Sequence, residues 1–265
     1  MLLREVEYAR PASVQDALRL LGANEGARAL AGGQTLINVM KARAASPDVL
    51  IDLADIAELR GIELGADGTL ELGAMTTYTD IIDSAEARAR PILGEVCNQI
   101  ADVQVRNRGT IGGNVCSNDP TNHLPPLLVA IGATMTIVGP GGERSVSAQE
   151  FFLGVYMTAV SQGELLTKIT IPAGKHDGFA AVTLGADGTC IANAAASVNG
   201  KVRIALGCVD AVPVLVEAAD ADSVPAAVRA AGLDPPGDVH ASSEYRAHLA
   251  EVLAVRAARQ ALGRS

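Results

Sequence analysis

The chain has 265 residues, enough for one large or two modest domains, and 49% of them are apolar, so it is not a disordered chain. Its net charge is −9, and it contains no Trp, three Phe and four Tyr. Nucleic-acid and anionic-membrane surfaces need positive charge, and base-stacking platforms also need aromatic side chains, so these classes are excluded. An anionic ligand must therefore be held locally, by backbone N–H groups.

The first third predicts a small βαβ-like unit. Ser13 is suited to cap a helix that Gly22 ends, and Gly32-Gly33 separates a strand from a following helix. The elements expected here are a helix over 14–21, a strand over 27–30, a short helix over 36–42 and a buried strand over 49–53.

The remainder predicts two further groups of elements separated by a polar linker. The first group has strands over 70–74, 134–138 and 167–171 and a helical region over 78–101 broken at Pro91. After the linker come strands near 179–184, 190–198 and 202–208, with turns at Asp187-Gly188 and Asn199-Gly200, a tail from Pro213 that is expected to be helical, and a last helix over about 243–262. We place the domain boundary between residues 1–173 and 174–265, and we expect Asp177 in the linker to be solvated.

Targeting and metal signals are weak. The N-terminus lacks an apolar signal core, and the longest apolar run, 124–138, is short and interrupted by Pro and Gly, so no membrane span is expected. The four cysteines are widely spaced without a C-x-x-C, which argues against a metal site or a disulfide scaffold. A cytoplasmic protein fits best.

Two glycine segments, 31–35 (AGGQT) and 110–114 (TIGGN), are the main candidates for a binding site. Glycine lets another atom approach the backbone, and successive N–H groups in such a turn form a nest for an anion. Two facing nests would hold a pyrophosphate. A Gly-Gly pair is more often only a turn, and neither segment has Rossmann or P-loop spacing.

The order and separation of these segments resemble the FAD-binding medium subunit of the molybdenum hydroxylases. The resemblance extends to residues 100–109 before the second segment, to 163–166 before a strand, and to 243–246 at the start of the last helix. It implies an α+β FAD domain of the vanillyl-alcohol-oxidase (PCMH) type, followed by a small domain of antiparallel sheet and helices.

The resemblance also implies cofactor contacts. Both glycine segments would wrap the FAD pyrophosphate and ribityl chain, Ala101 would touch the cofactor with its backbone, and Ile191 would cover the flavin ring. The candidate FAD-binding residues are Ala31, Gly32, Gly33, Gln34, Thr35, Ala101, Thr110, Ile111, Gly112, Gly113, Asn114, Ser117, His123, Leu166, Thr183 and Ile191. No residue of this chain is expected to be catalytic or to bind a metal.

Two positions depart from the family pattern. His123 stands where many relatives have Asp, and it is either a cofactor ligand or merely a loop histidine. Thr183 and Ala186 stand where relatives tend to carry Lys and Arg. A missing cation near the flavin would lower its potential or slow its reaction with the acceptor.

Four other residues have competing interpretations. Arg106 and Arg108 either meet phosphate or, as we favour, brace a loop or an interface. Tyr156 is expected to pack in the core rather than near the flavin, and Cys116 is expected to be a small buried side chain rather than a reactive thiol.

The function implied by the resemblance is electron transfer within a molybdenum hydroxylase. A large molybdopterin subunit would oxidise the substrate, and a small subunit with two [2Fe–2S] clusters would pass electrons to FAD and then to an external acceptor. The expected assembly is a dimer of heterotrimers. The alternatives are an FAD-depleted assembly subunit, a stand-alone FAD oxidoreductase and a small-molecule binding protein.

Overall fold

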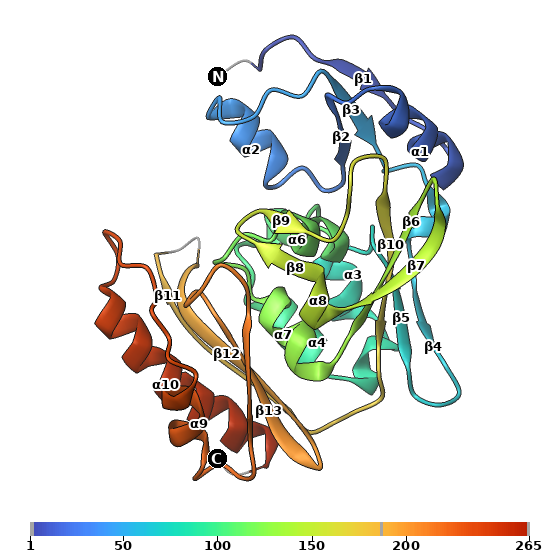
Figure 1. The fold of residues 1–265 in the computed structure, drawn as a ribbon. Helices are drawn as coiled ribbons and strands as arrows, with labels where there is room; N and C mark the ends of the chain where they lie inside the picture. Colours follow the sequence, from blue (N-terminus) through green and yellow to red (C-terminus); the bar gives the residue numbers. More distant parts are fainter. Residues whose placement is uncertain (1–2, 186–187, 264–265) are drawn as a thin grey trace.

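The computed structural model describes residues 3–185 and 188–263. The chain forms three consecutive parts, which Figure 1 shows from the blue N-terminal part, through the green and yellow middle, to the red C-terminal part. Each part is built around its own sheet. Among the described residues, no helix combines the length and the apolar character that crossing a membrane would require.

The N-terminal part is a three-stranded parallel sheet with strand order β1-β3-β2. Its elements are β1 (Glu7–Ala9), α1 (Val14–Ala23), β2 (Ala27–Leu30), α2 (Leu36–Lys41) and β3 (Val49–Asp52). Strands β2 and β3 pair in parallel across the α2 connection, so the predicted βαβ unit is confirmed. Ser13 caps α1 as expected, but the helix continues through Gly22 to Ala23. Strand β1 was not predicted.

The middle part contains a five-stranded antiparallel sheet, β4-β5-β10-β6-β7. Its strands are β4 (Ile62–Leu64), β5 (Leu70–Gly73), β6 (Thr134–Gly139), β7 (Gly142–Ser147) and β10 (Leu165–Ile171), with a short ribbon of β8 (Phe152–Gly154) and β9 (Met157–Thr158) beside it. The helical elements are η1 (Ala57–Leu59), α3 (Tyr78–Asp83), η2 (Ala87–Ala89), α4 (Ile92–Asn98), α5 (Val103–Arg106), α6 (Ile111–Ser117), α7 (Leu124–Ile131) and α8 (Ala148–Phe151). The apolar run 124–138 therefore divides into α7 and β6, with Gly132 as the left-handed cap between them.

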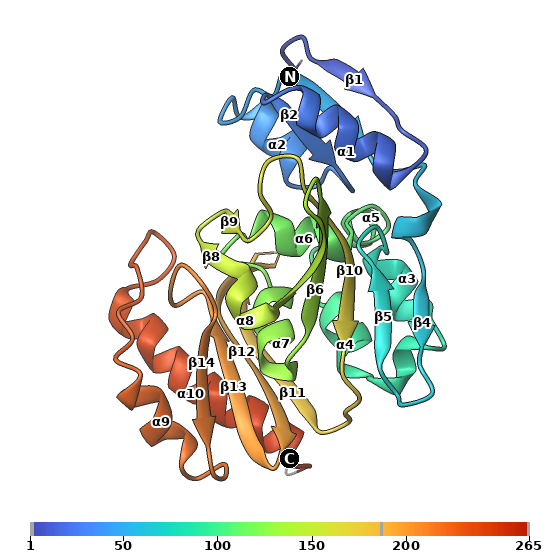
Figure 2. The same ribbon diagram turned by 45° about the vertical axis from the view of Figure 1, so that its right-hand side comes forward.

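The C-terminal part is a four-stranded antiparallel sheet whose two faces are both covered. Its elements are β11 (Asp177–Leu184), β12 (Thr189–Asn199), β13 (Lys201–Gly207), β14 (Val214–Ala218), α9 (Val224–Ala230) and α10 (Ser243–Ala261). Helix α10 packs on one face and α7 of the middle part packs on β12 and β13. Figure 2 shows α4, α6 and α7 lying between the two antiparallel sheets. This arrangement confirms the predicted α+β class with a second antiparallel sheet.

The tail after Pro213 was expected to be helical, but residues Val214–Ala218 form edge strand β14, whose alternate side chains Val216 and Ala218 are buried. The β12–β13 turn at Asn199-Gly200 is present, with Gly200 at a φ of 78°. The sequence predicts a turn at Asp187-Gly188 and has Ala186 where relatives tend to carry a cation. Both Ala186 and Asp187 lie outside the residues that the structure describes.

The linker between β10 and β11 is anchored at Asp177 by a buried ion pair, although Ala173, Lys175 and His176 are exposed. Arg90 donates to both carboxylate oxygens of Asp177 at 2.8 Å, and the two side chains are only 4% and 3% exposed. Arg90 also donates to the carbonyl of Pro172 and to the hydroxyl of Ser197. The expectation of a solvated Asp177 was wrong because this carboxylate pairs with an arginine 87 residues earlier in the chain.

Candidate functional site: a cleft between two glycine segments

A cleft with a volume of about 480 Å³ lies where the N-terminal part meets the middle part. Both glycine segments line it, as the sequence predicted, and its size is typical of a small-molecule or cofactor site. The predicted site residues that line the cleft are Ala31, Gly32, Gly33, Gln34, Thr35, Thr110, Gly112, Gly113, Asn114, Ser117 and Leu166.

The first glycine segment connects β2 to α2 and leaves backbone donors unused. Gly33 has a φ of 74°, which a side chain would strain. Glycine is required at position 32 for a different reason, because a Cβ there would lie 2.0 Å from the carbonyl oxygen of Arg108. The hydrogen bonds within the described part of the chain do not use the N–H groups of Gly33, Gln34 or Thr35. These N–H groups are available to a ligand in the cleft.

The second glycine segment is not a nest. It forms the first turn of helix α6, capped by the hydroxyl of Thr110, which accepts from the N–H of Gly113 at 3.1 Å. The N–H of Ile111 donates to Thr76 and that of Gly112 to Ala74, so these donors are already occupied. Its glycines serve close packing instead.

Close packing around the second segment is severe. A Cβ on Gly112 would lie 2.5 Å from the carbonyl oxygen of Ala74, and one on Gly113 would lie 3.3 Å from the Cβ of Ala31 in the first segment. The two segments therefore lie against each other, and the bare surface of Gly113 forms part of the cleft wall. Both segments contribute to one site, but only the first offers free N–H groups.

Asn114 supplies an unpaired acceptor in the cleft lining. Its side chain is 8% exposed, and its Oδ1 atom is buried without a hydrogen-bond partner. Its backbone carbonyl accepts from the hydroxyl of Ser117 at 2.7 Å and from Nδ2 of Asn122 at 3.1 Å. A buried amide oxygen without a donor is costly, so a ligand that donates to it would be favoured.

The rim contains residues that the sequence reasoning missed or misread. Tyr156 was expected in the core, but it is 59% exposed at a φ of 56°, lines the cleft, and donates its hydroxyl to Asp119 at 3.1 Å. The carboxylate of Glu164 also lines the cleft. The guanidinium of Arg144, 2.7 Å away, holds the pKa of Glu164 below its usual value. This pairing limits the repulsion that an anionic ligand would meet.

Five predicted residues do not line the cleft. Ile111 is buried in the central core, and Ile191 is buried in the C-terminal core where it forms a bulge between β11 and β12. His123 is buried against Phe179, at 5.2 Å between ring centroids. Thr183 is exposed on β11, and Ala101 has a φ of 43° in the segment after α4.

Arg106 follows the interpretation that we favoured, whereas Cys116 is only half-buried and lines the cleft. Arg106 donates to the carbonyls of Ile100 and Ala101 at 3.0 and 2.9 Å, so it braces the turn that holds Ala101 in its left-handed conformation. Partial burial raises the pKa of the Cys116 thiol, which disfavours the thiolate at neutral pH.

Comparison with known proteins places this chain in a family. The family described as "FAD binding domain in molybdopterin dehydrogenase" matches residues 4–174. The carbon monoxide dehydrogenase medium chain of Afipia carboxidovorans is 39% identical over 100% of this chain and 99% of its own length, and the glyceraldehyde dehydrogenase medium chain of Sulfolobus acidocaldarius is 33% identical over 96% and 97%. Two solved structures superpose on 99% of both chains: carbon monoxide dehydrogenase from Hydrogenophaga pseudoflava (TM-score 0.91, 36% identity) and quinoline 2-oxidoreductase from Pseudomonas putida 86 (0.90, 34%).

The fold and the cleft thus define a cofactor-binding flavoprotein, and its relatives are subunits of oxidoreductases. Free N–H groups, bare glycine surface and the unpaired oxygen of Asn114 fit a dinucleotide with a diphosphate and donor groups. The chain belongs to the family of FAD-binding medium subunits of the molybdenum hydroxylases.

Proposed function

We propose that this chain holds FAD in the cleft and relays electrons from a molybdenum centre, through [2Fe–2S] clusters, to an external acceptor. FAD, when bound, supplies the chemistry of accepting and releasing these electrons. The chain itself positions the cofactor and shields it. The observation that carries the proposal is the meeting of the two glycine segments, 31–35 and 110–114, in one cleft with unused N–H groups.

The contacts follow from the chemistry of each cleft residue. The free N–H groups of Gly33, Gln34 and Thr35 are suited to the diphosphate, because they carry partial positive charge without adding a basic side chain. The unpaired Oδ1 of Asn114 is suited to an N–H or hydroxyl of the cofactor. Leu166 supplies apolar contact. We do not assign cofactor contacts to the side chains of His123 and Ile191, which are buried elsewhere.

The partners in this proposal are a large molybdopterin subunit and a small iron–sulfur subunit, assembled as a dimer of heterotrimers in the cytoplasm. The medium-chain names of the relatives support it, because a medium chain implies a larger and a smaller companion. Residues 1–173 would form the FAD domain and 174–265 the second domain. The effect of Thr183 on the flavin potential remains a prediction, to be tested by redox titration of Thr183→Lys.

The cleft assignment is tested with Gly113→Val. The new side chain starts 2.9 Å from Oγ1 of Thr110 and 3.3 Å from the Cβ of Ala31, in the gap between the two segments, so FAD occupancy of the purified complex should fall strongly. The matched control is Gly141→Val in the β6–β7 turn, where a Cβ has no neighbour within 4 Å. The flavin-to-protein ratio and the FAD dissociation constant measure the effect. Full occupancy in Gly113→Val would refute the cleft assignment.

A further inference from the structure

A second polar cluster lies outside the cleft, where the middle and C-terminal parts meet. The amide nitrogen of Asn193 is 3.3 Å from the sulfur of Cys190, 3.7 Å from that of Cys208 and 3.3 Å from Nδ1 of His123. All four side chains are buried, and Asn193 is fully inaccessible. Two thiols thus converge on a single amide group, although 18 positions separate them in the chain.

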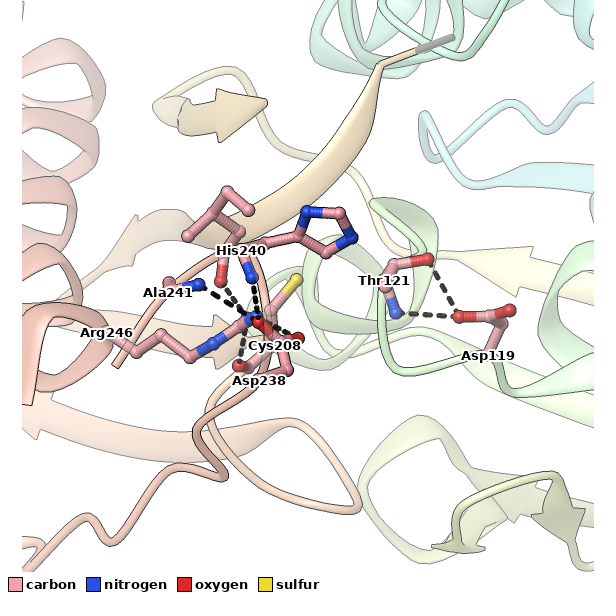
Figure 3. A network of polar contacts seen from close by, with 8 residues as sticks. Asp119, Thr121, Cys208, Asp238, His240, Ala241 and Arg246 are labelled. Atoms are coloured by element: carbon pink, nitrogen blue, oxygen red, sulfur yellow. Dashed lines mark hydrogen bonds and ion pairs between the residues drawn. The ribbon is translucent and has the colours of Figure 1, made fainter. Parts of the chain in front are cut away.

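Both cysteines sit on backbone that a buried arginine clamps. Arg246 on α10 donates to the carbonyls of Ile191 and Cys208, and its other nitrogen pairs with Asp238 at 2.6 Å. Figure 3 shows Arg246 reaching from its helix toward Cys208 and Asp238. Cys208 has a φ of 65°, an uncommon conformation for a residue with a side chain. Arg246 therefore fixes the backbone at Ile191, which follows Cys190, and at Cys208.

The environment makes the two thiols chemically unequal. The neighbouring Cys208 thiol lowers the pKa of Cys190, with further lowering by His123 and Asn193. Cys190 and burial in turn raise the pKa of Cys208. One sulfur is thus prepared to act as a nucleophilic thiolate, and its neighbour holds the proton, which is the arrangement of an attacking and a resolving cysteine.

We propose that Cys190 and Cys208 form an oxidisable dithiol that hydrogen peroxide converts into an intramolecular disulfide. The sulfur of Cys190 attacks one peroxide oxygen, the O–O bond breaks, and the released hydroxide takes a proton to leave as water. The sulfur of Cys208 then attacks the Cys190 sulfenic acid, the S–S bond forms, and the second oxygen leaves as water. Two thiols lose two electrons and two protons, and peroxide is reduced to two waters.

A chain of hydrogen bonds connects this dithiol to the cleft. Nδ2 of Asn193 donates to the carbonyl of Asn122 at 3.3 Å, and Nδ2 of Asn122 donates to the carbonyl of Asn114 at 3.1 Å. A disulfide removes the thiol and thiolate partners of Asn193, so we expect it to shift Asn122 and weaken FAD binding. This consequence rests on the proposed function, whereas the dithiol itself does not, and the two are measured separately.

The dithiol is tested on the purified complex by titration with hydrogen peroxide at neutral pH, followed by alkylation, trypsin digestion and mass spectrometry. Cys190 lies in the peptide 176–201 and Cys208 in the peptide 204–229. We expect these two peptides to be joined, with a mass about 2 Da below their sum, and to separate on reduction. Cys97→Ser is the control, because Cys97 is buried away from the cluster and should leave the link intact.

Either Cys190→Ser or Cys208→Ser should abolish the link, and Asn193→Ala should slow its formation. If a serine variant fails to fold, the wild-type peptide map alone decides. Cysteines 190 and 208 that remain reduced, or that become only sulfinic acids, would overturn the proposal. The FAD dissociation constant of oxidised and reduced protein then tests the connection to the cleft. An equal value in both forms would remove that consequence and leave the dithiol standing.

Discussion

The glycines of the cleft show that one residue type can be required for two different reasons. Gly33 is needed for its positive φ, whereas Gly32 is needed because the carbonyl of Arg108 occupies the position of its Cβ. By contrast, Gly22 lies inside helix α1 with no atom within 4 Å of the position of a Cβ. The three glycines look alike in the sequence. Substituting them should nevertheless change the free energy of unfolding in different directions.

Gly32→Ala should destabilise the chain by about 1–3 kcal/mol, because the added methyl group forces the segment away from Arg108. It should also weaken FAD binding. Gly22→Ala should stabilise the chain by about 0.5–1 kcal/mol, because alanine loses less backbone entropy in a helix. Urea unfolding of both variants measures the free energies. Equal effects of the two substitutions would contradict the assigned contact.

Buried thiols should make the chain less stable at alkaline pH. Burial raises the pKa of Cys97 to about 12, whereas an unfolded cysteine has a pKa of about 8.5. The unfolded chain therefore loses this proton first, and the contribution of Cys97, complete below pH 8.5, is lost as the pH rises towards 12. Each such group should lower the unfolding free energy by about 1.4 kcal/mol per pH unit.

Cys97→Ala should reduce this alkaline slope, although it lowers stability at neutral pH by leaving a cavity. Unfolding free energies between pH 7 and 10 under reducing conditions measure the slope. An unchanged slope in Cys97→Ala would contradict the burial of this thiol.

At the scale of elements, the junction between β10 and β11 depends on a contact that no local pattern reveals. The linker sequence is polar and reads as solvated, yet Asp177 begins β11 and is enclosed by Arg90, which lies just before α4. A Cβ on Gly174 would lie 2.8 Å from the same guanidinium. The linker is therefore packed around an arginine and does not behave as a free tether.

Asp177→Asn should cost about 3–5 kcal/mol, because it leaves the guanidinium of Arg90 buried without a counter-charge. The matched control is Glu217→Gln, which breaks an exposed ion pair with Lys201 and should cost less than about 1 kcal/mol. Denaturant unfolding compares the two variants. A small effect at Asp177 would show that the pair is open to water.

At the scale of the whole molecule, the middle and C-terminal parts share one hydrophobic core. The largest cluster of buried residues includes Phe179, Ala195 and Ala205 of the C-terminal sheet together with α7 of the middle part. Helix α7 is buried along its whole length between the two sheets. Separating the two parts would expose this helix to water, so neither part is expected to be stable alone.

The full chain should therefore unfold as one cooperative unit across residue 173. Calorimetry should show a single transition that contains both parts, and saturating FAD should raise its midpoint. A fragment of residues 1–173 should be insoluble or should bind a hydrophobic dye, because it lacks the sheet that covers α7. Two well-separated transitions, or a well-folded fragment, would contradict the shared core.

The sequence predicted the elements better than their contacts. Strands such as β2 and β5 and the helix after Ser13 follow from periodicity and capping, which are local. The second glycine segment was expected to be a nest, but Thr110 caps a helix there, because a Thr before a short helical turn gives the same pattern as a loop. Tyr156 and Asp177 were misread because their partners, Asp119 and Arg90, are distant in the sequence.

The contact between Gly32 and the carbonyl of Arg108 also constrains engineering of this protein. The turn after β2 fits only against the particular backbone path that precedes Thr110. A chimera that takes only one glycine segment from a relative would pair two segments whose backbones do not fit each other. Only a transplant of both segments together should retain the cofactor.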